Sequence, residues 1–206
     1  MKRFREYMEE SVEEPTGSLT IFDIDDTLFH TTAQIAVVKD GETIAKLTNQ
    51  EFNNYKLGDG ESFDFSEFRD AHKFYHESKP IGRMLAKAKA ILANSVKNPL
   101  SKVIIITARA NFDDRDKFLA TFRKYGFDID RVRVERAGEL VGNEIPAVKK
   151  VIIVKRYLAT NNYKTVRLFD DSMSNLREFL KLRNEYKNIK FEAFFANPDG
   201  SVKVIK

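Results

Sequence analysis

Three carboxylates, Asp23, Asp25 and Asp26, follow an apolar, β-branched run at residues 19–22. A buried strand is expected to stop before the first of these charges, because burying an unpaired carboxylate is costly. If the chain stays extended for two more residues, Asp23 and Asp25 lie on the same side. Two carboxylates that close are tolerated when a cation lies between them or when one keeps its proton, and both conditions suit phosphate chemistry. The alternative is that the acids are only turn formers or helix caps.

Thr107, Ala108 and Arg109 lie at the end of a second apolar run, which starts at Lys102. A continuous apolar run is typical of a strand buried on both faces of a parallel sheet. At its end, a hydroxyl group and free backbone N–H groups can hold the non-bridging oxygens of a phosphate. The alternative for Thr107 is a helix cap, and Arg109 has two open roles: contact with a substrate phosphate or bracing of the loop.

Asp170 and Asp171 form a second acidic strand end, after the segment 165–169. A hard cation such as Mg²⁺ binds one or two carboxylates together with water and phosphate oxygens, so acids from two adjacent strands suffice. The alternative is that an Asp pair followed by Ser172 simply starts a helix, because Asp and Ser are good N-cap residues.

The elements that must position these residues alternate between strands and helices. The apolar patterns predict strands at 19–22, 102–107, 131–135, 165–171, 190–196 and 202–205, and helices at 81–93, 113–124, 147–158 and 173–185. This alternation indicates an α/β protein with a three-layer, Rossmann-like parallel sheet. Ligands of such sheets bind beyond the carboxyl ends of the strands, where both acidic segments and Thr107 lie.

The segment between His30 and Ile81 separates the first two predicted strands of this sheet. Asp40-Gly41 lies between two β-like runs and predicts a two-residue hairpin, and residues 66–75 resemble a helix. We expect residues 31–80 to form a small cap over the acidic site, with packing against the flank of the domain as the alternative. We expect most of the aromatic side chains to form the insert's own core, with one or two at the opening; they include Phe52, Tyr55, Phe63 and Phe65. Residues 1–17 read as an N-terminal arm, and 18–206 as the domain.

Composition sets the outer limits of the interpretation. The 206 residues, with 42% hydrophobic and 32% charged content, suit one soluble globular domain. No apolar run approaches the ~20 residues of a membrane helix, and the N-terminus has no apolar core of a secretory signal. The absence of cysteine excludes disulfides and thiolate chemistry and fits a cytoplasmic location. The net charge of +4 favours anionic substrates in general.

The segment from Asp23 to Thr27, placed directly after an apolar strand, resembles the first motif (DxDxT) of the haloacid dehalogenase-like (HAD) phosphohydrolases. Thr107 stands where that family has the Thr or Ser of its second motif, and the segment 169–172 resembles the fourth. The third motif is a lysine on the helix before the fourth strand. The resemblance covers about residues 18–175, with the motifs in order. Many members of the family carry a cap between the first and second motifs, where this chain has its insert.

The resemblance implies a Mg²⁺-dependent phosphomonoesterase. Asp23 would attack phosphorus and form an aspartyl-phosphate, and Asp25 would protonate the leaving alcohol and then deprotonate the attacking water. Thr107, Ala108 and Arg109 would bind the substrate's phosphate.

The metal ligands implied by the family are the Asp23 carboxylate, the Asp25 backbone carbonyl and Asp170. Asp171 would bond a metal-bound water or hold the lysine. Members usually carry a further acid or polar residue shortly after the fourth motif. Asn175 occupies that region here, so a further carboxylate ligand is absent or replaced by an amide.

Three lysines are candidates for the third motif: Lys149, Lys150 and Lys155. Its role would be to neutralise the nucleophile and the transferring phosphoryl group. We choose Lys149, because 147–150 opens the helix at the end nearest the site. Lys150 is nearly as good a candidate, and a lysine on a helix is by default solvated.

Within the family, the arrangement resembles small phage phosphatases and the phosphatase domain of polynucleotide kinase/3′-phosphatases. The expected partner is therefore a small phosphorylated substrate, either a nucleotide or the end of a nucleic acid. No membrane partner is expected, and the sequence does not predict the oligomeric state. The alternative is a non-catalytic HAD-like binding module whose aromatic insert binds nucleic acid or a protein partner. A kinase is not supported, because no phosphate-binding Gly-x-x-x-x-Gly-Lys-Ser/Thr loop occurs.

Overall fold

A computed structural model describes residues 16–52 and 54–206. A six-stranded sheet with strand order β11-β10-β9-β1-β7-β8 forms its centre. Neighbouring strands are parallel except for β11, which runs antiparallel to β10. The strands are β1 (Gly17–Phe22), β7 (Lys102–Thr107), β8 (Arg133–Arg136), β9 (Tyr163–Asp170), β10 (Lys190–Ala196) and β11 (Val202–Ile205). The predicted arm at residues 1–17 lies largely outside the described residues.

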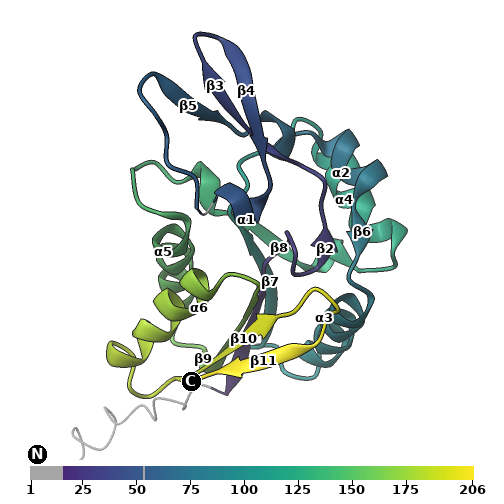
Figure 1. Cartoon of the computed structure of the whole chain (residues 1–206). Coiled ribbons are helices and arrows are strands. Elements are labelled where there is room, and N and C mark those ends of the chain that lie inside the picture. Colours follow the sequence, from purple (N-terminus) through teal and green to yellow (C-terminus); the bar gives the residue numbers. More distant parts are fainter. Residues whose placement is uncertain (1–15, 53) are drawn as a thin grey trace, which may run out of the picture.

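Helices cover both faces of this sheet (Figure 1). On one face pack α3 (Gly82–Ser95) and α4 (Arg115–Lys124), and on the other α5 (Pro146–Leu158) and α6 (Met173–Leu180). The central strands β1 and β7 are almost entirely buried, as their continuous apolar sequence requires. The predicted class, a three-layer Rossmann-like α/β fold, is confirmed.

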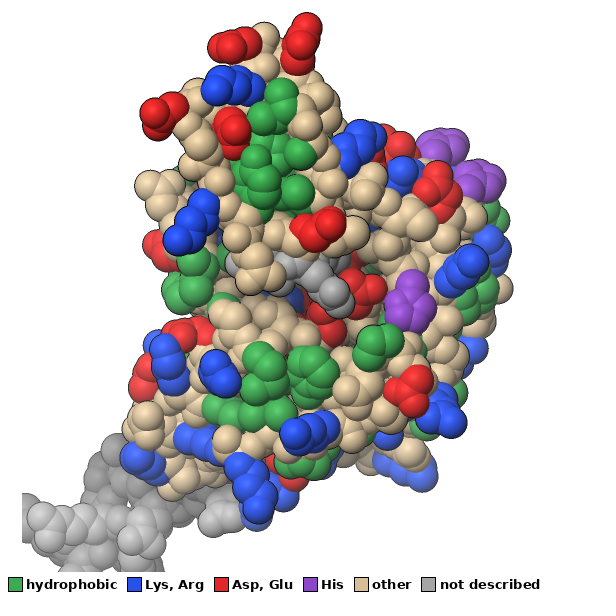
Figure 2. All heavy atoms as spheres, in the orientation of Figure 1, with side chains coloured by type: hydrophobic (Ala, Val, Ile, Leu, Met, Phe, Trp, Pro, Cys, Tyr) green, Lys and Arg blue, Asp and Glu red, His purple; other side chains and the backbone are tan. Residues whose placement is uncertain are grey.

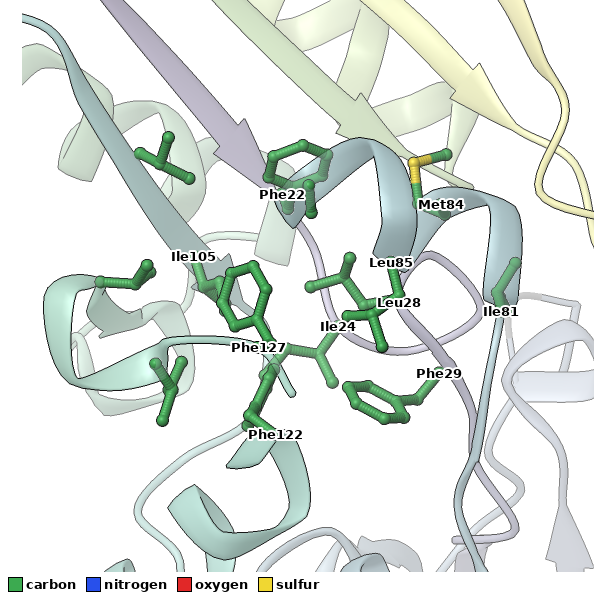
Figure 3. Packing of buried hydrophobic residues seen from close by; sticks show 14 of the residues in the cluster. Phe22, Ile24, Leu28, Phe29, Ile81, Met84, Leu85, Ile105, Phe122 and Phe127 are labelled. Carbon is green, nitrogen blue, oxygen red and sulfur yellow. The ribbon is translucent and has the colours of Figure 1, made fainter. Parts of the chain in front are cut away.

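The chain directly after β1 is anchored in the main core. Ile24, Leu28 and Phe29 have no exposed surface, and Figure 3 shows them packed with Phe22 and Phe122. Since Ile24 lies between Asp23 and Asp25, its burial restricts where these two carboxylates can point.

The insert begins and ends at a two-stranded ladder between β2 (Phe29–His30) and β6 (Lys79–Pro80). It contains a three-stranded antiparallel sheet of order β4-β3-β5, which projects beyond the main domain (Figure 1). The hairpin at Asp40-Gly41 forms as predicted, and φ values of 52° and 83° suit its two-residue turn. The remaining elements in the insert are β3 (Ile35–Lys39), β4 (Glu42–Leu47), α1 (Asn49–Phe52), β5 (Glu61–Asp64), the 3₁₀ turn η1 (Ser66–Phe68) and α2 (Ala71–Glu77).

The helix expected at 66–75 is divided in two. Asp70 is extended and its side chain accepts a hydrogen bond from the Lys73 backbone N–H, so it ends the 3₁₀ turn and caps α2. Helix α2 then packs against α4 and buries Ala71 and Phe74 in the main core. The second half of the insert therefore packs against the flank of the main domain, which was the alternative to a cap.

Other boundaries differ from the sequence patterns by a few residues. Helix α4 starts at Arg115 because Asp114 caps it, and β8 starts at Arg133 after a 3₁₀ turn, η2, at Ile129–Arg131. Helix α6 ends at Leu180, where a second turn, η4 (Lys181–Asn184), continues the chain. Among the described residues, no helix has the length and apolar character needed to cross a membrane.

Candidate active site

The acidic site lies where the order of the parallel strands changes direction: β7 and β8 extend from β1 on one side, and β9 and β10 extend from it on the other. Strand β1 pairs with β7 on one side and β9 on the other, so the carboxyl ends of all three strands meet. Asp23 follows β1, Thr107 ends β7 and Asp170 ends β9. This is the usual ligand position in open parallel sheets. Acidic side chains gather in a hollow at this position, between the insert and the main domain (Figure 2).

Lys150 reaches this point from α5 and joins two of the strand ends. Its Nζ donates to Asp23 Oδ1 at 2.7 Å and to Asp170 Oδ2 at 2.8 Å, and all three side chains are buried. Lys149 instead donates to the carbonyl of Leu140 at 2.7 Å. The choice of Lys149 is therefore corrected to Lys150. The physical reason is helix geometry, since adjacent residues on a helix point about 100° apart.

Lys155, the third candidate, pairs with Glu185 on the surface. A sequence signal for Lys150 did exist. It lies on the buried stripe of α5 with Ala147, Val151 and Val154, at the i, i+3, i+4, i+7 spacing of a core-facing helix. A lysine on that stripe must find a buried counterion.

The carboxylates of this cluster exceed its cations. Burial and the charge of Asp170 raise the pKa of Asp23 to about 7, although Lys150 opposes them. Burial and Asp170 likewise raise the pKa of Asp171 to about 8. Burial alone would lower the pKa of Lys150, but Asp170 and Asp23 outweigh it and raise that pKa. With all groups ionised, three carboxylates face one ammonium, which leaves a double negative charge.

This cluster fits a hard divalent cation. Asp23, Asp170 and Asp171 each offer one carboxylate oxygen, and these oxygens lie within 4.8 Å of one another. An all-oxygen donor set is what Mg²⁺ prefers, and a divalent cation would balance the excess charge. We expected Asp171 to contact a metal-bound water or the lysine, but one of its carboxylate oxygens lies close enough to those of Asp23 and Asp170 to bind the same cation. The backbone carbonyl of Asp25 as a metal ligand stays a prediction.

Asp170 is oriented by its own neighbours in α6. Its Oδ1 accepts from the backbone N–H of Ser172 at 2.9 Å and from Asn175 Nδ2 at 2.8 Å. Asn175, which stands where the family often has another acid, therefore holds a carboxylate through its amide. In metal sites such outer partners set the direction of the ligand.

The Asp25 carboxylate pairs with Arg109, while its charge still contributes, after burial and Asp170, to the raised pKa of Asp23. The chain turns after β1, with Asp26 at φ 54°, and the Asp25 carboxylate meets Arg109. Arg109 Nε donates to Asp25 Oδ2 at 2.9 Å and Nη2 to Oδ1 at 2.6 Å, while the Thr31 hydroxyl donates to Oδ1 at 2.8 Å. Burial would raise the pKa of Asp25, but Arg109 and Thr31 outweigh it and hold that pKa below its usual range.

Arg109 is a buried residue with only 3% of its surface exposed. Its Nη1 donates to the carbonyl of Phe68 at 2.8 Å, and its guanidinium lies 4.7 to 5.3 Å from the ring centroids of Phe68, Phe74 and Phe112. These contacts link Asp25 to η1 and α2 of the insert. Of the two roles left open for Arg109, bracing is the one that its contacts describe.

Thr107 and Ala108 line the remaining edge of the site. Thr107 is fully buried and its Oγ1 accepts from the Arg109 backbone N–H at 3.1 Å, whereas Ala108 is exposed. Gly138, in the 3₁₀ turn η3 (Ala137–Glu139), packs closely under this loop. Sequence reasoning missed Thr31, Gly138 and the carbonyl of Phe68, and no local pattern marks any of them.

Comparison with known proteins adds little to these observations. No family model and no curated protein matches the chain. Among solved structures, the HAD domain of the effector protein Lem4 from Legionella pneumophila matches with a TM-score of 0.47 and 16% identity, over 88% of this chain and 87% of that one. A likeness of this degree carries no argument about activity, which must come from the site itself.

Proposed function

We propose that this protein is a HAD-like phosphomonoesterase that uses Mg²⁺ and an aspartyl-phosphate intermediate. The observation that carries the proposal is Lys150, buried between Asp23, which follows β1, and Asp170 at the end of β9. A buried lysine with two carboxylates, beside a third carboxylate and at the ligand position of a parallel sheet, suits the stabilisation of a transferring phosphoryl group.

Asp23 is the proposed nucleophile. Its carboxylate attacks phosphorus, the bond to the leaving oxygen breaks, and an acyl-phosphate remains for water to hydrolyse. Lys150 orients Asp23 and favours its ionised form, against the burial and the Asp170 charge that raise its pKa. The Thr107 hydroxyl and the N–H groups of the following loop bind the non-bridging oxygens. Bound Mg²⁺, held by Asp23, Asp170 and Asp171, would supply positive charge against the phosphoryl oxygens.

Asp25 is the proposed proton-transfer group. In its pair with Arg109 it is ionised, which is the form that accepts a proton. The pair lowers its pKa, however, so Asp25 becomes an effective base for the attacking water when the contact with Arg109 opens. Donation to a leaving alcohol requires Asp25 first to leave this pair and gain a proton. A phenolate leaving group needs no such donation, which makes an aryl phosphate the suitable first substrate.

The proposed natural substrate is a nucleotide or the phosphate at a nucleic-acid end. Support comes from the resemblance of the motifs to phage-type phosphatases and from the mild excess of basic residues, with a net charge of +4. A comparison of 3′-phosphorylated oligonucleotides, mononucleotides and sugar phosphates at equal concentration tests this part of the proposal.

The decisive experiment replaces Asp23 by Asn and measures hydrolysis of p-nitrophenyl phosphate with Mg²⁺ and with EDTA. An amide cannot form the acyl-phosphate, so activity is expected to vanish while the fold persists. Asp26→Asn is the matched control, because Asn tolerates the positive φ of that position and Asp26 is outside the cluster. Retention of more than about a hundredth of the wild-type rate by folded Asp23→Asn would exclude covalent catalysis at Asp23.

A second candidate is a non-catalytic HAD-like module that binds nucleic acid or a protein partner. One observation favours it. Asp25 pairs with Arg109, which also bonds the carbonyl of Phe68, so Asp25 has a structural role between the loop and the insert even in a protein without catalytic activity. Absence of Mg²⁺-dependent hydrolysis across the phosphate panel, with retained binding of an oligonucleotide, would favour this module over the enzyme.

A further inference from the structure

A second cavity lies at the other end of the sheet from the acidic site. It has a volume of about 390 Å³, and its lining includes Lys102 at the start of β7 and Arg133 at the start of β8. Thr107, at the opposite end of β7, belongs to the acidic site. Since β7 has six residues and a strand rises about 3.3 Å per residue, ~16 Å separate its two ends. The cavity is therefore distinct from the proposed catalytic centre.

The rim of this cavity is positively charged. Lys102, Arg131 and Arg133 contribute to the lining, and none of the described residues adds a carboxylate to it. Arg133 has a counterion outside the lining, since its Nε lies 2.5 Å from Glu135 Oε1. Lys102 and Arg131 are exposed, and neither has an ion pair with another described residue. Two cations that form no ion pair within the described part of the chain, at one opening, favour an anionic ligand.

The floor and walls of the cavity are apolar. Leu92, Val103 and Ile104 are buried below it, and Val96 at its edge is 54% exposed. An exposed valine beside a cavity can pack against the apolar part of a bound ligand. The volume lies in the range of pockets that hold small organic ligands, which are mostly apolar and carry a few polar anchors.

Two serine hydroxyl groups also line the cavity. The Ser95 hydroxyl donates to the carbonyl of Leu92 at 2.7 Å, so its oxygen is held in place. Ser101 Oγ accepts from the backbone N–H of Ser18 at 2.9 Å and from the Ser18 hydroxyl at 3.2 Å, so that its own proton remains as a donor. Together with the rim cations they supply polar anchors around an apolar floor.

We propose that this cavity binds a small organic anion with an apolar body, independently of the acidic site. The carboxylate, sulfonate or phosphate of the ligand pairs with Lys102 and Arg131. Its ring or short chain covers Val96, Val103 and Ile104. The proposal does not depend on the phosphatase activity, and either can fail without the other.

The test uses the full-length protein and 8-anilinonaphthalene-1-sulfonate, an aromatic anion that fluoresces when its apolar body leaves water. Binding at a single site is expected for the wild type. The double variant Lys102→Gln/Arg131→Gln should bind about tenfold more weakly, because two partly exposed ion pairs are lost. Lys203→Gln, an exposed lysine on β11, is the matched control and should leave the affinity unchanged.

Two further arms separate charge from apolar contact. N-phenyl-1-naphthylamine, which lacks the sulfonate, should bind the wild type about tenfold more weakly than the anion does. Val96→Trp should reduce binding of the anion by filling the mouth of the cavity. Chemical-shift changes in an NMR titration should centre on residues 92–104 and 131–133, away from 23–27.

Equal affinity of the wild type and the double variant would overturn the proposal. So would shift changes centred on the acidic loop, or a Kd weaker than about 1 mM for the wild type. Circular dichroism of each variant establishes that a loss of binding does not come from unfolding.

Discussion

Lys149 and Lys150 are neighbours of the same type with different surroundings. Lys150 Nζ is shared by two buried carboxylates, whereas Lys149 Nζ meets one backbone carbonyl. Removing one member of a buried charged group leaves the others without compensation, which is more costly than removing a partly exposed lysine. The pair therefore provides a built-in comparison at the scale of single residues.

We expect Lys150→Met to reduce kcat for aryl phosphate hydrolysis by about a hundredfold or more, because Asp23 loses its cation and its orientation. The same change should lower the free energy of unfolding by about 3 kcal/mol through the unpaired buried carboxylates. Lys149→Met should stay within a few-fold of the wild type in kcat. Steady-state kinetics and urea unfolding measure both effects, and similar kcat values for the two variants would contradict the assignment of Lys150.

At the scale of elements, the backbone of η3 packs directly against the backbone of the loop after β7 and holds that loop in place. A Cβ atom on Gly138 would lie 2.5 Å from the carbonyl oxygen of Ala108 and 2.8 Å from the backbone N of Ala110. Both atoms are backbone, so they cannot move without shifting the loop. The proposed phosphate-binding groups of this loop thus depend on a glycine about thirty positions away in the sequence.

Gly138→Ala is expected to lower kcat/KM for an aryl phosphate by about tenfold and to destabilise the protein by about 1–3 kcal/mol, as in overpacked sites. Gly82→Ala, at the start of α3, is the control, since no atom lies within 4 Å of the position that a Cβ atom would take there. That control should retain activity and gain slightly in thermal stability. A Gly138→Ala enzyme with unchanged kcat/KM would show that the loop does not need this close approach.

Glu67 in η1 fastens the sheet of the insert to α2. It accepts from the Gln34 backbone N–H at 3.0 Å and from Lys46 Nζ at 2.8 Å, and Lys73 Nζ lies 3.2 Å away. Burial would raise the pKa of Glu67, but Lys46, the Gln34 N–H and Lys73 outweigh it and lower that pKa to about 2. A carboxyl group with a lowered folded-state pKa stabilises the fold above its ordinary pKa of 4.5, and this stabilisation is lost as the pH falls towards 2.

We therefore expect Glu67→Gln to be less stable than the wild type by about 1–2 kcal/mol at pH 7, since the group is partly exposed. The difference between the two proteins should shrink between pH 4.5 and pH 2. Urea unfolding over this range measures it, with Glu42→Gln, an exposed acid of β4, as the control. A difference that stays constant with pH would mean that the carboxylate charge of Glu67 is not what stabilises the insert.

At the scale of the whole molecule, the insert consists of two parts with different attachments. The sheet β4-β3-β5 has a small core of its own around Ile35, Val37 and Leu47, with Phe68. Phe52, Tyr55 and Phe63 pack against this core, while Phe65 is 44% exposed. The α2 part belongs to the main core and, with η1, supports Arg109. Only the sheet can be removed without exposing the core of the main domain.

A variant in which an Asn-Gly turn replaces residues 37–63 tests whether the sheet selects substrates. Ala36 and Asp64 are directly paired, so a tight turn can join them. Hydrolysis of a small aryl phosphate should persist, because Asp23, Lys150 and Asp170 lie outside the segment. Selectivity among natural phosphates should fall, since a cover contributes positioning and closure. If the trimmed protein folds and keeps the substrate ranking of the full chain, the sheet is not a specificity cap.

The amino-acid sequence was enough to predict the fold class and the place of the site. The apolar runs of β1, β7 and β9 predicted a parallel sheet, because strands buried on both faces need continuous apolar sequence. Acids and a threonine directly after these runs then had to meet at one edge of that sheet. The hairpin at Asp40-Gly41 was also predictable, since its turn geometry depends on two adjacent residues.

Which side chains meet within the site depends on the packing of the whole chain. Lys150 and Asp23 are 127 positions apart in the sequence, and Arg109 and Asp25 are 84 apart. The direction of Asp25 follows from the turn after β1 and from the buried Ile24 and Leu28, and the surroundings of Arg109 come from a helix in the insert. The apolar stripe of α5 indicates that Lys150 faces the core, but which carboxylate it meets depends on how separate elements pack, and no local pattern of residue types shows that.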